Sequence, residues 1–405
     1  MAGEWHTATL GDVVSLQRGH DLSEDQRSAG SIPVMGSFGV TGYHNEARAR
    51  GPGVTIGRSG ASFGATSYVE VDYWPLNTCM YVTDFRGNNP KFCYFLLKTI
   101  DFAGYNSGSA QPSLNRNFIY PIELRLPPRG DQDRIANLLG SLDDKIELNR
   151  RMAATLEEMA RALFKSWFVD FDPVRAKAEG RNPGLPATTA ALFPDAFGGD
   201  GLPVGWNSVT LGDLATLDRS TVDPSSLSDA VVDHYSLPAF DDNRAPVQEP
   251  ASSIKSLKLS LSAPVVLFSK LNPDTPRVWP LRRAGKIAVA STEFLALRPS
   301  RLSSLTWLTC LLSSDVFVAK AAGMVTGTSK SHQRVQPDSL LRTPWPAPAD
   351  VVMAAFEQVV APLHERVDVL LESARQLAAL RDTLLPKLIS GELRIKDMGK
   401  DVEAA

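Results

Sequence analysis

The chain has 405 residues, of which 43% are hydrophobic and 21% are charged, and its net charge is −3. The length allows two or three globular domains, and the near-neutral charge excludes a uniformly basic nucleic-acid-binding protein. No run approaches the roughly 18 apolar residues of a membrane helix. The first residues also lack the basic and apolar blocks of a signal peptide. We therefore expect a cytoplasmic protein without membrane attachment.

Residues 1–128 are rich in glycine, aromatic residues and short β-type runs, of which Gly53–Gly57 and Met80–Thr83 are the clearest. This pattern predicts a compact, loop-rich α+β domain. Pro127 and Pro128 end it, because proline has no backbone N–H and restricts the residue before it. The three cysteines, Cys79, Cys93 and Cys310, are odd in number and widely spaced, so we expect buried free thiols.

Residues 129–171 predict a long helix. Apolar residues recur there in alternating steps of four and three, which is typical of a coiled-coil seam. About forty residues at a rise of ~1.5 Å give a rod of roughly 55–60 Å. Residues 172–205 follow with several Gly and Pro turn signals, so we expect a linker that holds at most short helices.

The second half of the chain repeats the first. The segment Trp5…Thr9-Leu10-Gly11-Asp12 returns 201 residues later as Trp206…Thr210-Leu211-Gly212-Asp213. The same correspondence predicts a second globular domain at residues 206–348, a second long helix at 349–393 and a tail at 394–405. Two amphipathic helices in one chain should cover each other's apolar seams. We expect an antiparallel pair, with the buried Asn149 helping to fix its register.

No catalytic constellation stands out. Phe197-Gly198-Gly199-Asp200-Gly201 imitates a loop that binds S-adenosylmethionine, but it lies in the linker rather than between a strand and a helix. The sequence has no phosphate-binding P-loop and no usual nuclease carboxylate motif, and the spacing of its six histidines is not that of metal ligands. We expect a protein that recognises a ligand without transforming it.

The ordered repeat resembles the specificity subunit of type I restriction–modification systems over essentially the whole chain. The segments that carry the resemblance are the two opening motifs, Ser107–Leu114, Ile122–Gln132, Leu142–Ile146, Ala162–Phe171, Ser291-Thr292 and Leu384–Leu393. The resemblance implies two target-recognition domains, at 1–128 and 206–348, joined by two long antiparallel helices. Each domain would read one half of a split double-stranded DNA site, and the helices would set the spacer between the halves.

The same resemblance implies the partners. Two methyltransferase subunits would dock on the helices, and restriction or translocase subunits would bind those in turn. S-adenosylmethionine, ATP and Mg would then be bound by partner subunits, and this chain would bind no cofactor. We expect the docking surface to include the aromatic residues that crowd the end of the first helix, because aromatic side chains are enriched at interface cores. They are Phe164, Trp167, Phe168 and Phe171.

Polar residues beside glycine turns are the candidates for DNA contacts, since such groups suit phosphates and base edges. In the first domain they are Arg58, Ser109, Gln111, Ser113, Asn115 and Arg116. In the second they are Lys270, Asn272, Thr328, Lys330, His332, Gln333 and Arg334. Each has an ordinary alternative role as a turn-stabilising residue. A run of basic residues between Lys255 and Lys286 adds local charge to the second domain, or is simply a solvated strand face.

Two other functions remain open from the sequence. The repeated domains of a scaffold would bind proteins rather than DNA, and its binding would lack the steep salt dependence of nucleic-acid complexes. A self-contained methyltransferase or nuclease is disfavoured by the missing motifs.

Overall fold

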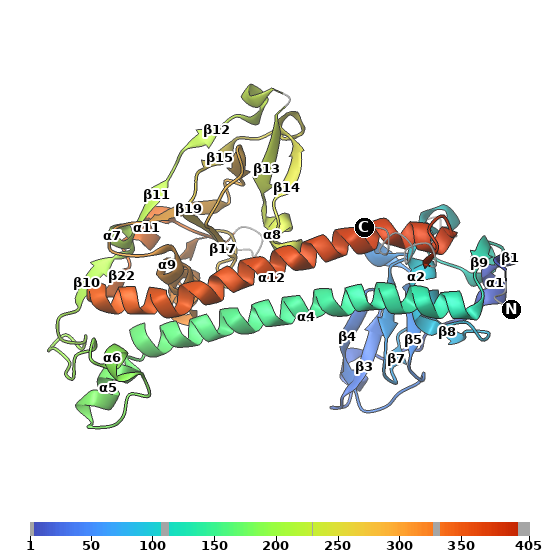
Figure 1. Cartoon of the computed structure of the whole chain (residues 1–405), viewed down its shortest axis with the longest axis horizontal. Helices are drawn as coiled ribbons and strands as arrows, with labels where there is room; N and C mark the ends of the chain where they lie inside the picture. Colours follow the sequence, from blue (N-terminus) through green and yellow to red (C-terminus); the bar gives the residue numbers. More distant parts are fainter. Residues whose placement is uncertain (1–3, 107–112, 229, 327–332, 396–405) are drawn as a thin grey trace, which may run out of the picture. The chain divides into compact units, whose positions relative to one another are not determined.

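The computed structural model describes residues 4–106, 113–228, 230–326 and 333–395, and Figure 1 shows its elements. The chain divides into two compact units. Unit 1 comprises Met1–Leu148 with Ser373–Ala405, and unit 2 comprises Asn149–Glu372. The chain has two long helices, α4 (Arg129–Phe168) and α12 (Asp350–Ser390). Each of them is divided between the two units. The fold is α+β, as expected.

Unit 1 is built on a four-stranded antiparallel sheet in the order β2-β8-β5-β6. A three-stranded sheet, β4-β3-β7, and the pair β1-β9 complete it, and helix α2 packs on β5 and β6. The two runs predicted as strands are confirmed as β5 and as part of β8. The elements are β1 (His6–Thr9), α1 (Leu10–Val13), β2 (Ser15–Arg18), β3 (Ile32–Gly36), β4 (Gly39–His44), β5 (Gly53–Gly57), β6 (Thr66–Val69), β7 (Trp74–Pro75), β8 (Cys79–Asp84), α2 (Pro90–Lys98), α3 (Arg116–Ile119) and β9 (Glu123–Leu126), with 3₁₀ turns at Glu24–Gln26, Gly60–Ser62 and Phe102–Tyr105.

Unit 2 repeats this plan. Its sheet β11-β19-β16-β17 has the strand order of the four-stranded sheet of unit 1, and helix α9 packs on it. The rest comprises a five-stranded sheet, β12-β15-β18-β13-β14, and the pairs β10-β22 and β20-β21. The strands are β10 (Asn207–Thr210), β11 (Ala215–Asp218), β12 (Thr221–Val222), β13 (Val231–Tyr235), β14 (Val247–Pro250), β15 (Lys258–Leu261), β16 (Val265–Ser269), β17 (Val278–Leu281), β18 (Ala288–Ala290), β19 (Phe294–Pro299), β20 (Val325–Thr326), β21 (Arg334–Val335) and β22 (Pro344–Ala347).

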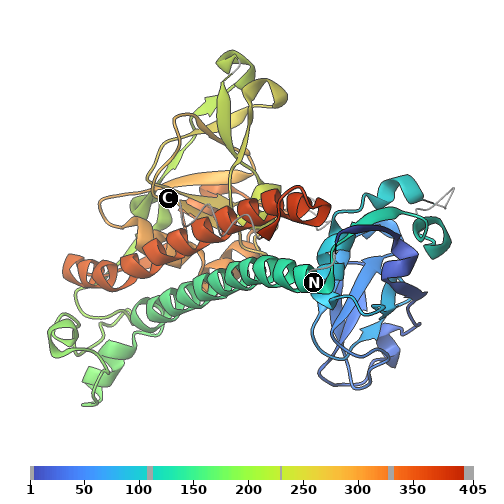
Figure 2. The ribbon, with the colours of Figure 1, turned by 45° about the vertical axis from the view of Figure 1, so that its right-hand side comes forward.

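Helices α5 and α6 lie in the segment between α4 and β10, beside the C-terminal end of α4 (Figure 2). The shorter helices of unit 2 are α5 (Asp172–Ala178), α6 (Ala187–Ala190), α7 (Leu211–Leu214), α8 (Leu237–Asn243), α9 (Leu305–Leu312), α10 (Asp315–Ala322) and α11 (Pro337–Leu341), with 3₁₀ turns at Pro224–Leu227 and Ala251–Ser253. Among the residues described, no single helix is long and apolar enough to span a membrane. The bent pair α9 and α10 meets that test by length and composition only when both helices are taken together.

The repeated Thr-Leu-Gly-Asp motif has a local structural reason. In unit 1 the carboxylate of Asp12 accepts the N–H of Thr9 at 2.9 Å, and in unit 2 that of Asp213 accepts the N–H of Thr210 at 2.8 Å. These bonds form a capping box that starts α1 and α7. Hydrogen bonds from the threonine hydroxyl and backbone lower the pKa of both carboxyl groups.

The two long helices pair antiparallel within each unit, as predicted. In unit 1 the guanidinium of Arg381 donates to Asp143 at 2.6 Å, and Leu388 belongs to the core cluster of Leu139. In unit 2, Ala153 clusters with Val367 and Leu370. Residues later in α4 therefore contact residues earlier in α12, as an antiparallel pair requires. Asn149 is buried, which fits its expected place in the seam.

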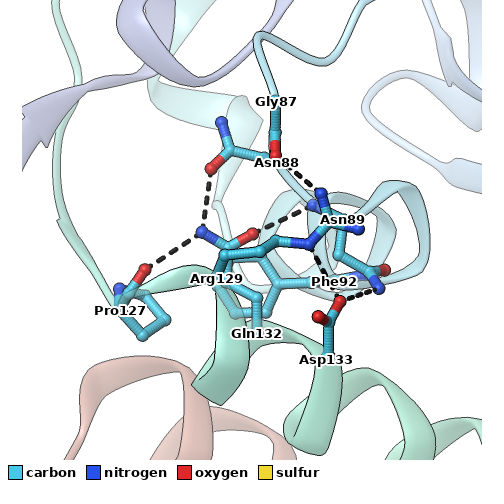
Figure 3. Close-up of polar contacts among 8 residues, drawn as sticks. All are labelled: Gly87, Asn88, Asn89, Phe92, Pro127, Arg129, Gln132 and Asp133. Atoms are coloured by element: carbon cyan, nitrogen blue, oxygen red, sulfur yellow. Dashed lines mark hydrogen bonds and ion pairs between the residues drawn. The ribbon is translucent and has the colours of Figure 1, made fainter. Parts of the chain in front are cut away.

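A buried amide connects the start of α4 to the rest of unit 1 (Figure 3). The side-chain oxygen of Gln132 accepts the N–H of Asn89 at 3.0 Å. Its nitrogen donates to the side chain of Asn88 at 2.8 Å and to the carbonyl of Pro127 at 3.0 Å. Asn89 also caps α2 by accepting the N–H of Phe92. Gln132 is 2% exposed, so this network fixes the direction in which the helix leaves the domain.

Unit 2 has a comparable joint with different chemistry. Ser304, the residue that caps α9, donates its hydroxyl to Glu357 of α12. Thr306 donates to the other oxygen of the same carboxylate at 2.8 Å. In both units, therefore, the cap of the helix that packs on the four-stranded sheet is hydrogen-bonded to the beginning of a long helix.

Candidate nucleic-acid interface

Arg58 lies directly after the central strand β5, at the end of the four-stranded sheet of unit 1. Its carbonyl accepts the N–H of Leu114 at 2.9 Å, and its N–H donates to Thr78 at 2.9 Å. The neighbouring residues Ser59 and Ser113 form an isolated antiparallel bridge. The backbone of Arg58 is therefore fixed from both sides, while its guanidinium has no hydrogen bond or ion pair to any described residue.

A hollow of about 560 Å³ opens at this end of the sheet. It brings together four of the first-domain candidates, although Arg58 and the other three are far apart in the sequence. Arg18, Arg58 and Arg116 contribute three positive charges to the wall, and Asp21 contributes one negative charge at 3.9 Å from Arg18. The lining is completed by Gln17, Gly19, His20, Met80, Ser113, Leu114 and Asn115. A mainly cationic wall with several neutral donors suits phosphate and base-edge contacts.

Lys270 occupies the equivalent position in unit 2. It follows strand β16, which corresponds to β5 in strand order, and its carbonyl accepts the N–H of Val335 at 3.0 Å. The next residue, Leu271, forms an isolated antiparallel bridge with Arg334. Within the described part of the chain the ammonium group of Lys270 makes no hydrogen bond or ion pair. Both units thus present a cation at the same point of the same sheet.

Several candidates already have structural roles. Asn115 accepts the N–H of Asn117 and caps α3, and the guanidinium of Arg116 donates to the carbonyl of Leu16 at 2.8 Å. Arg334 pairs with Glu293 through two hydrogen bonds. Asn272 has a positive φ of 49°, and its side-chain oxygen is buried without a hydrogen-bond partner in the structure as described.

The carbonyl of Gln333 accepts the N–H of Asn272 at 3.0 Å, which places these two candidates beside Lys270. The remaining candidates, Ser109, Gln111, Thr328, Lys330 and His332, lie outside the described residues.

The basic run between Lys255 and Lys286 does not form one continuous cationic surface. Arg277 is paired with Asp241 at 2.6 and 2.8 Å, and Arg282 with Asp368 at 3.1 Å. Lys258 is buried, and its ammonium group donates to Ser256. Three of these charges are therefore satisfied inside unit 2, while Arg283 and Lys286 are exposed.

Sequence reasoning missed Arg18 and its repeat partner. Arg18 ends strand β2 and lines the hollow, and Arg219 follows strand β11 in unit 2. The signal was present, because Arg219 follows Arg18 by the same 201 residues that separate the two opening motifs. Arg219 is paired with Asp338 at 2.7 Å. His20, which also lines the hollow, is 3.4 Å from the hydroxyl of Tyr81 through its Nε2.

Burial corrects the expectation from the sequence for three of the four aromatic residues that were expected at the docking surface. Phe164, Trp167 and Phe168 are at most 2% exposed and pack in the core of unit 2, while Phe171 is half-buried. The ring of Phe168 lies 4.9 Å from that of Phe356, and that of Trp167 lies 5.0 Å from that of Phe193. The physical reason is that the globular part of unit 2 and the segment after α4 cover these rings.

The described residues contain no group of three or more His, Cys, Asp or Glu side chains that could hold a metal ion. The three cysteines are free and buried, as expected. Burial raises the pKa of the thiols of Cys79 and Cys93 to about 12, so neither is an activated nucleophile. Phe197–Gly201 forms a turn in which the N–H of Gly198 donates to Leu202.

Comparisons with known proteins agree with the geometry. Residues 2–158 match the family described as the type I restriction modification DNA specificity domain. The type I restriction enzyme HindI specificity subunit of Haemophilus influenzae is 36% identical over 131 residues, which is 30% of this chain and 28% of that protein. The matched segment thus spans less than a third of the length of this relative.

A second relative matches over a longer stretch. The type I restriction enzyme MjaIX specificity subunit of Methanocaldococcus jannaschii is 24% identical over 357 residues, covering 82% of this chain and 76% of the relative. The crystal structure of the type I restriction–modification S subunit from M. genitalium covers 95% of this chain and 96% of its own, with a TM-score of 0.59 and 16% identity. At this identity the structural likeness shows the fold alone.

Proposed function

Because the chain belongs to the specificity subunits of type I restriction–modification systems, we propose that it recognises DNA for such a complex. Each unit reads one half of a bipartite double-stranded site. The observation that carries the proposal is the equivalence of Arg58 and Lys270. Each follows the corresponding strand of the same four-stranded sheet, and its backbone carbonyl accepts an N–H from a residue near other candidates in the sequence, Leu114 in unit 1 and Val335 in unit 2.

In this account the two classes of side chain have different tasks. Arg58 and Lys270 bind phosphates and hold each unit in register on the duplex, because unpaired cations contribute affinity that depends little on sequence. Neutral donors and acceptors beside them, such as Ser113 and Gln333, face base edges and supply discrimination. Arg18 adds a further phosphate contact in unit 1.

The long helices serve assembly and spacing. Two methyltransferase subunits dock on their outward faces, restriction or translocase subunits bind those, and the helix length sets the unread spacer between the half-sites. Exposed methionines on α4 support this location better than the buried rings do. Met152 is 38% and Met159 is 49% exposed, and methionine adapts well to a partner surface. S-adenosylmethionine, ATP and Mg are bound by the partner subunits, and this chain contributes recognition without catalysis.

Salt-dependent DNA binding by the assembled modification complex tests this proposal. Arg58→Ala and Lys270→Ala should each weaken binding to all duplexes and reduce the slope of log K against log salt by about one. Arg283→Ala is the matched control. Arg283 is an exposed cation that follows β17, and Leu281 of β17 pairs with Val265 at the start of β16, whereas Lys270 follows the end of β16. Its removal should therefore leave the slope unchanged.

The scaffold alternative predicts a different result. Wild-type binding to duplex DNA would be weak and insensitive to these three substitutions, while the complex with partner subunits would form normally. That combination would contradict DNA recognition.

A further inference from the structure

The turn between β3 and β4 carries an aromatic residue that the core does not use. Gly36 pairs with Gly39, so Ser37 and Phe38 form a two-residue turn. Phe38 is 77% exposed, the highest value for a large hydrophobic side chain among the described residues. Singly exposed apolar residues are common on protein surfaces, so its location must decide whether this one has a role.

The turn is held against the candidate DNA site. The hydroxyl of Ser37 donates to the carbonyl of Thr78 at 3.2 Å, and that carbonyl also accepts the N–H of Arg58 at 2.9 Å. Gly57 permits this approach, because a Cβ at that position would lie 2.6 Å from the carbonyl oxygen of Ser37. The turn that carries Phe38 is therefore held beside the backbone of Arg58, the proposed phosphate contact.

Unit 2 lacks an equivalent of this turn. Its strands β13 and β14 correspond to β3 and β4, since β13 also pairs in parallel with a third strand. Helix α8 connects them instead of a two-residue turn. The helix is tied down by the pairs Arg277–Asp241 and Arg244–Glu157, and its Phe240 packs 5.6 Å from Trp279. An exposed aromatic turn is thus a property of unit 1, and its effect should be confined to one half-site.

We propose that Phe38 determines specificity by contacting the C5-methyl group of a thymine in the half-site read by unit 1. The inference rests on the proposed DNA-recognition function. The edges of bases in the major groove present donors, acceptors and one apolar feature, which is the thymine methyl group. A phenyl ring has no hydrogen bond to offer, so that methyl group is the only base-edge feature it can distinguish. Arg58 beside it supplies the phosphate contact that holds the ring at the base.

The experiment uses the chain assembled with its methyltransferase subunits. Selection from randomised duplex DNA first defines the sequence bound by the wild type, by Phe38→Ala and by Phe38→Leu. Deoxyuridine, which lacks the methyl group, then replaces each thymine of the selected site in turn. Wild type should lose about fourfold in affinity at one thymine of one half-site, the equivalent of one methyl-sized apolar contact. Phe38→Ala should lose that discrimination, and Phe38→Leu should retain part of it.

Val71→Ala is the matched control. Val71 is 57% exposed in the same unit. It follows Val69, which pairs with Gly53 at the start of β5, whereas Arg58 follows the end of β5. Its substitution should leave every base preference intact. The inference is overturned if no deoxyuridine substitution lowers the affinity of the wild type, or if Phe38→Ala keeps the full loss of affinity. It is also overturned if Phe38→Ala changes the preference for a base other than that thymine. A wild-type complex that selects no sequence overturns the proposed function as well.

Discussion

The guanidinium group of Arg334 donates two hydrogen bonds to the carboxylate of Glu293, at 3.0 and 3.1 Å. The N–H of Lys270 donates to the backbone carbonyl of the same Glu293 at 3.0 Å. Glu293 therefore places a negative charge next to the proposed phosphate contact of unit 2. Its carboxylate pairs with the guanidinium group of Arg334, which would otherwise attract phosphate.

Removing that charge should strengthen non-specific DNA binding. Glu293→Gln removes one negative charge beside the proposed phosphate contact, so we expect tighter binding at low salt and a salt slope that is steeper by about one. Asp195→Asn, the same charge change at an exposed position between α6 and β10, serves as the control. Equal effects of the two variants would mean that only net charge matters, and that Glu293 does not regulate the site.

Gln132 should be important for the stability of unit 1. Gln132→Ala leaves buried groups of Asn88, Asn89 and Pro127 without a partner, which should lower the free energy of unfolding by about 2–4 kcal/mol. Gln132→Glu should also destabilise, because a carboxylate cannot donate a hydrogen bond to the side-chain oxygen of Asn88 or to the carbonyl of Pro127. Asn137→Ala, at an exposed position of the same helix, should change stability by less than about 0.5 kcal/mol. Denaturant unfolding measures all three, and a neutral Gln132→Ala would disprove the network's role.

Trp167 should contribute to folding rather than to partner docking. Its ring is 2% exposed and contacts Phe193 and Phe356, so Trp167→Ala should cost about 3–5 kcal/mol of unfolding free energy. Met159→Ala, at a residue 49% exposed on the same helix, should leave stability nearly unchanged and weaken methyltransferase assembly. The opposite pattern, with normal stability and lost assembly in Trp167→Ala, would restore the aromatic cluster as the docking surface.

His364 should make unit 2 sensitive to acid. Burial, together with the charge of Arg282, lowers the pKa of this imidazole from 6.5 to about 4, and its Nε2 lies 3.8 Å from the sulfur of Cys310. The unfolded chain therefore takes up a proton at a higher pH than the folded chain. Above pH 6.5 the imidazole is neutral in both states, and its contribution to the free energy of unfolding is fully present. As the pH falls toward 4, protonation of the unfolded chain lowers that free energy by on the order of 3 kcal/mol. In His364→Leu the loss of stability between pH 7 and pH 4.5 should be smaller, and an unchanged pH dependence would contradict the assignment.

The sequence predicted those features that depend on periodic patterns. The four-three spacing gave both long helices, since α4 and α12 follow the apolar seam, and the repeat gave the common plan of the two units. The sequence also offered Arg58 and Lys270 as polar candidates for DNA contacts, and the structure places each of them directly after a short buried strand. The need of each apolar seam for cover predicted that the two helices pair. The head-to-tail order of the repeat and the long linker after the first helix favoured the antiparallel direction.

What the sequence could not provide was the set of contacts between distant segments. The aromatic residues at the end of α4 have the composition of an interface, and only the packing of Phe193, Trp307 and Phe356 around them shows that they are core. The basic run from Lys255 was misleading for the same reason, since Asp241 and Asp368 neutralise two of its arginines. The sequence did not indicate a role for Phe38, because its exposure and its proximity to Arg58 arise from the fold.

Mapping of methylated bases would show whether the two units read two half-sites and whether the helices set the spacing between them. The map is made in cells that carry the partner subunits with the wild-type chain, or with a chain that has one heptad inserted after Asn149 and another after Leu370. Both insertions keep the seam in phase and lengthen each helix by about 10 Å. We predict a wild-type motif of two specified parts around an unspecified spacer, and a variant motif with the same parts and a spacer longer by about three base pairs. A continuous wild-type motif would mean that the units do not read separate half-sites, and a folded, active variant that keeps the original spacer would mean that the helices do not set it.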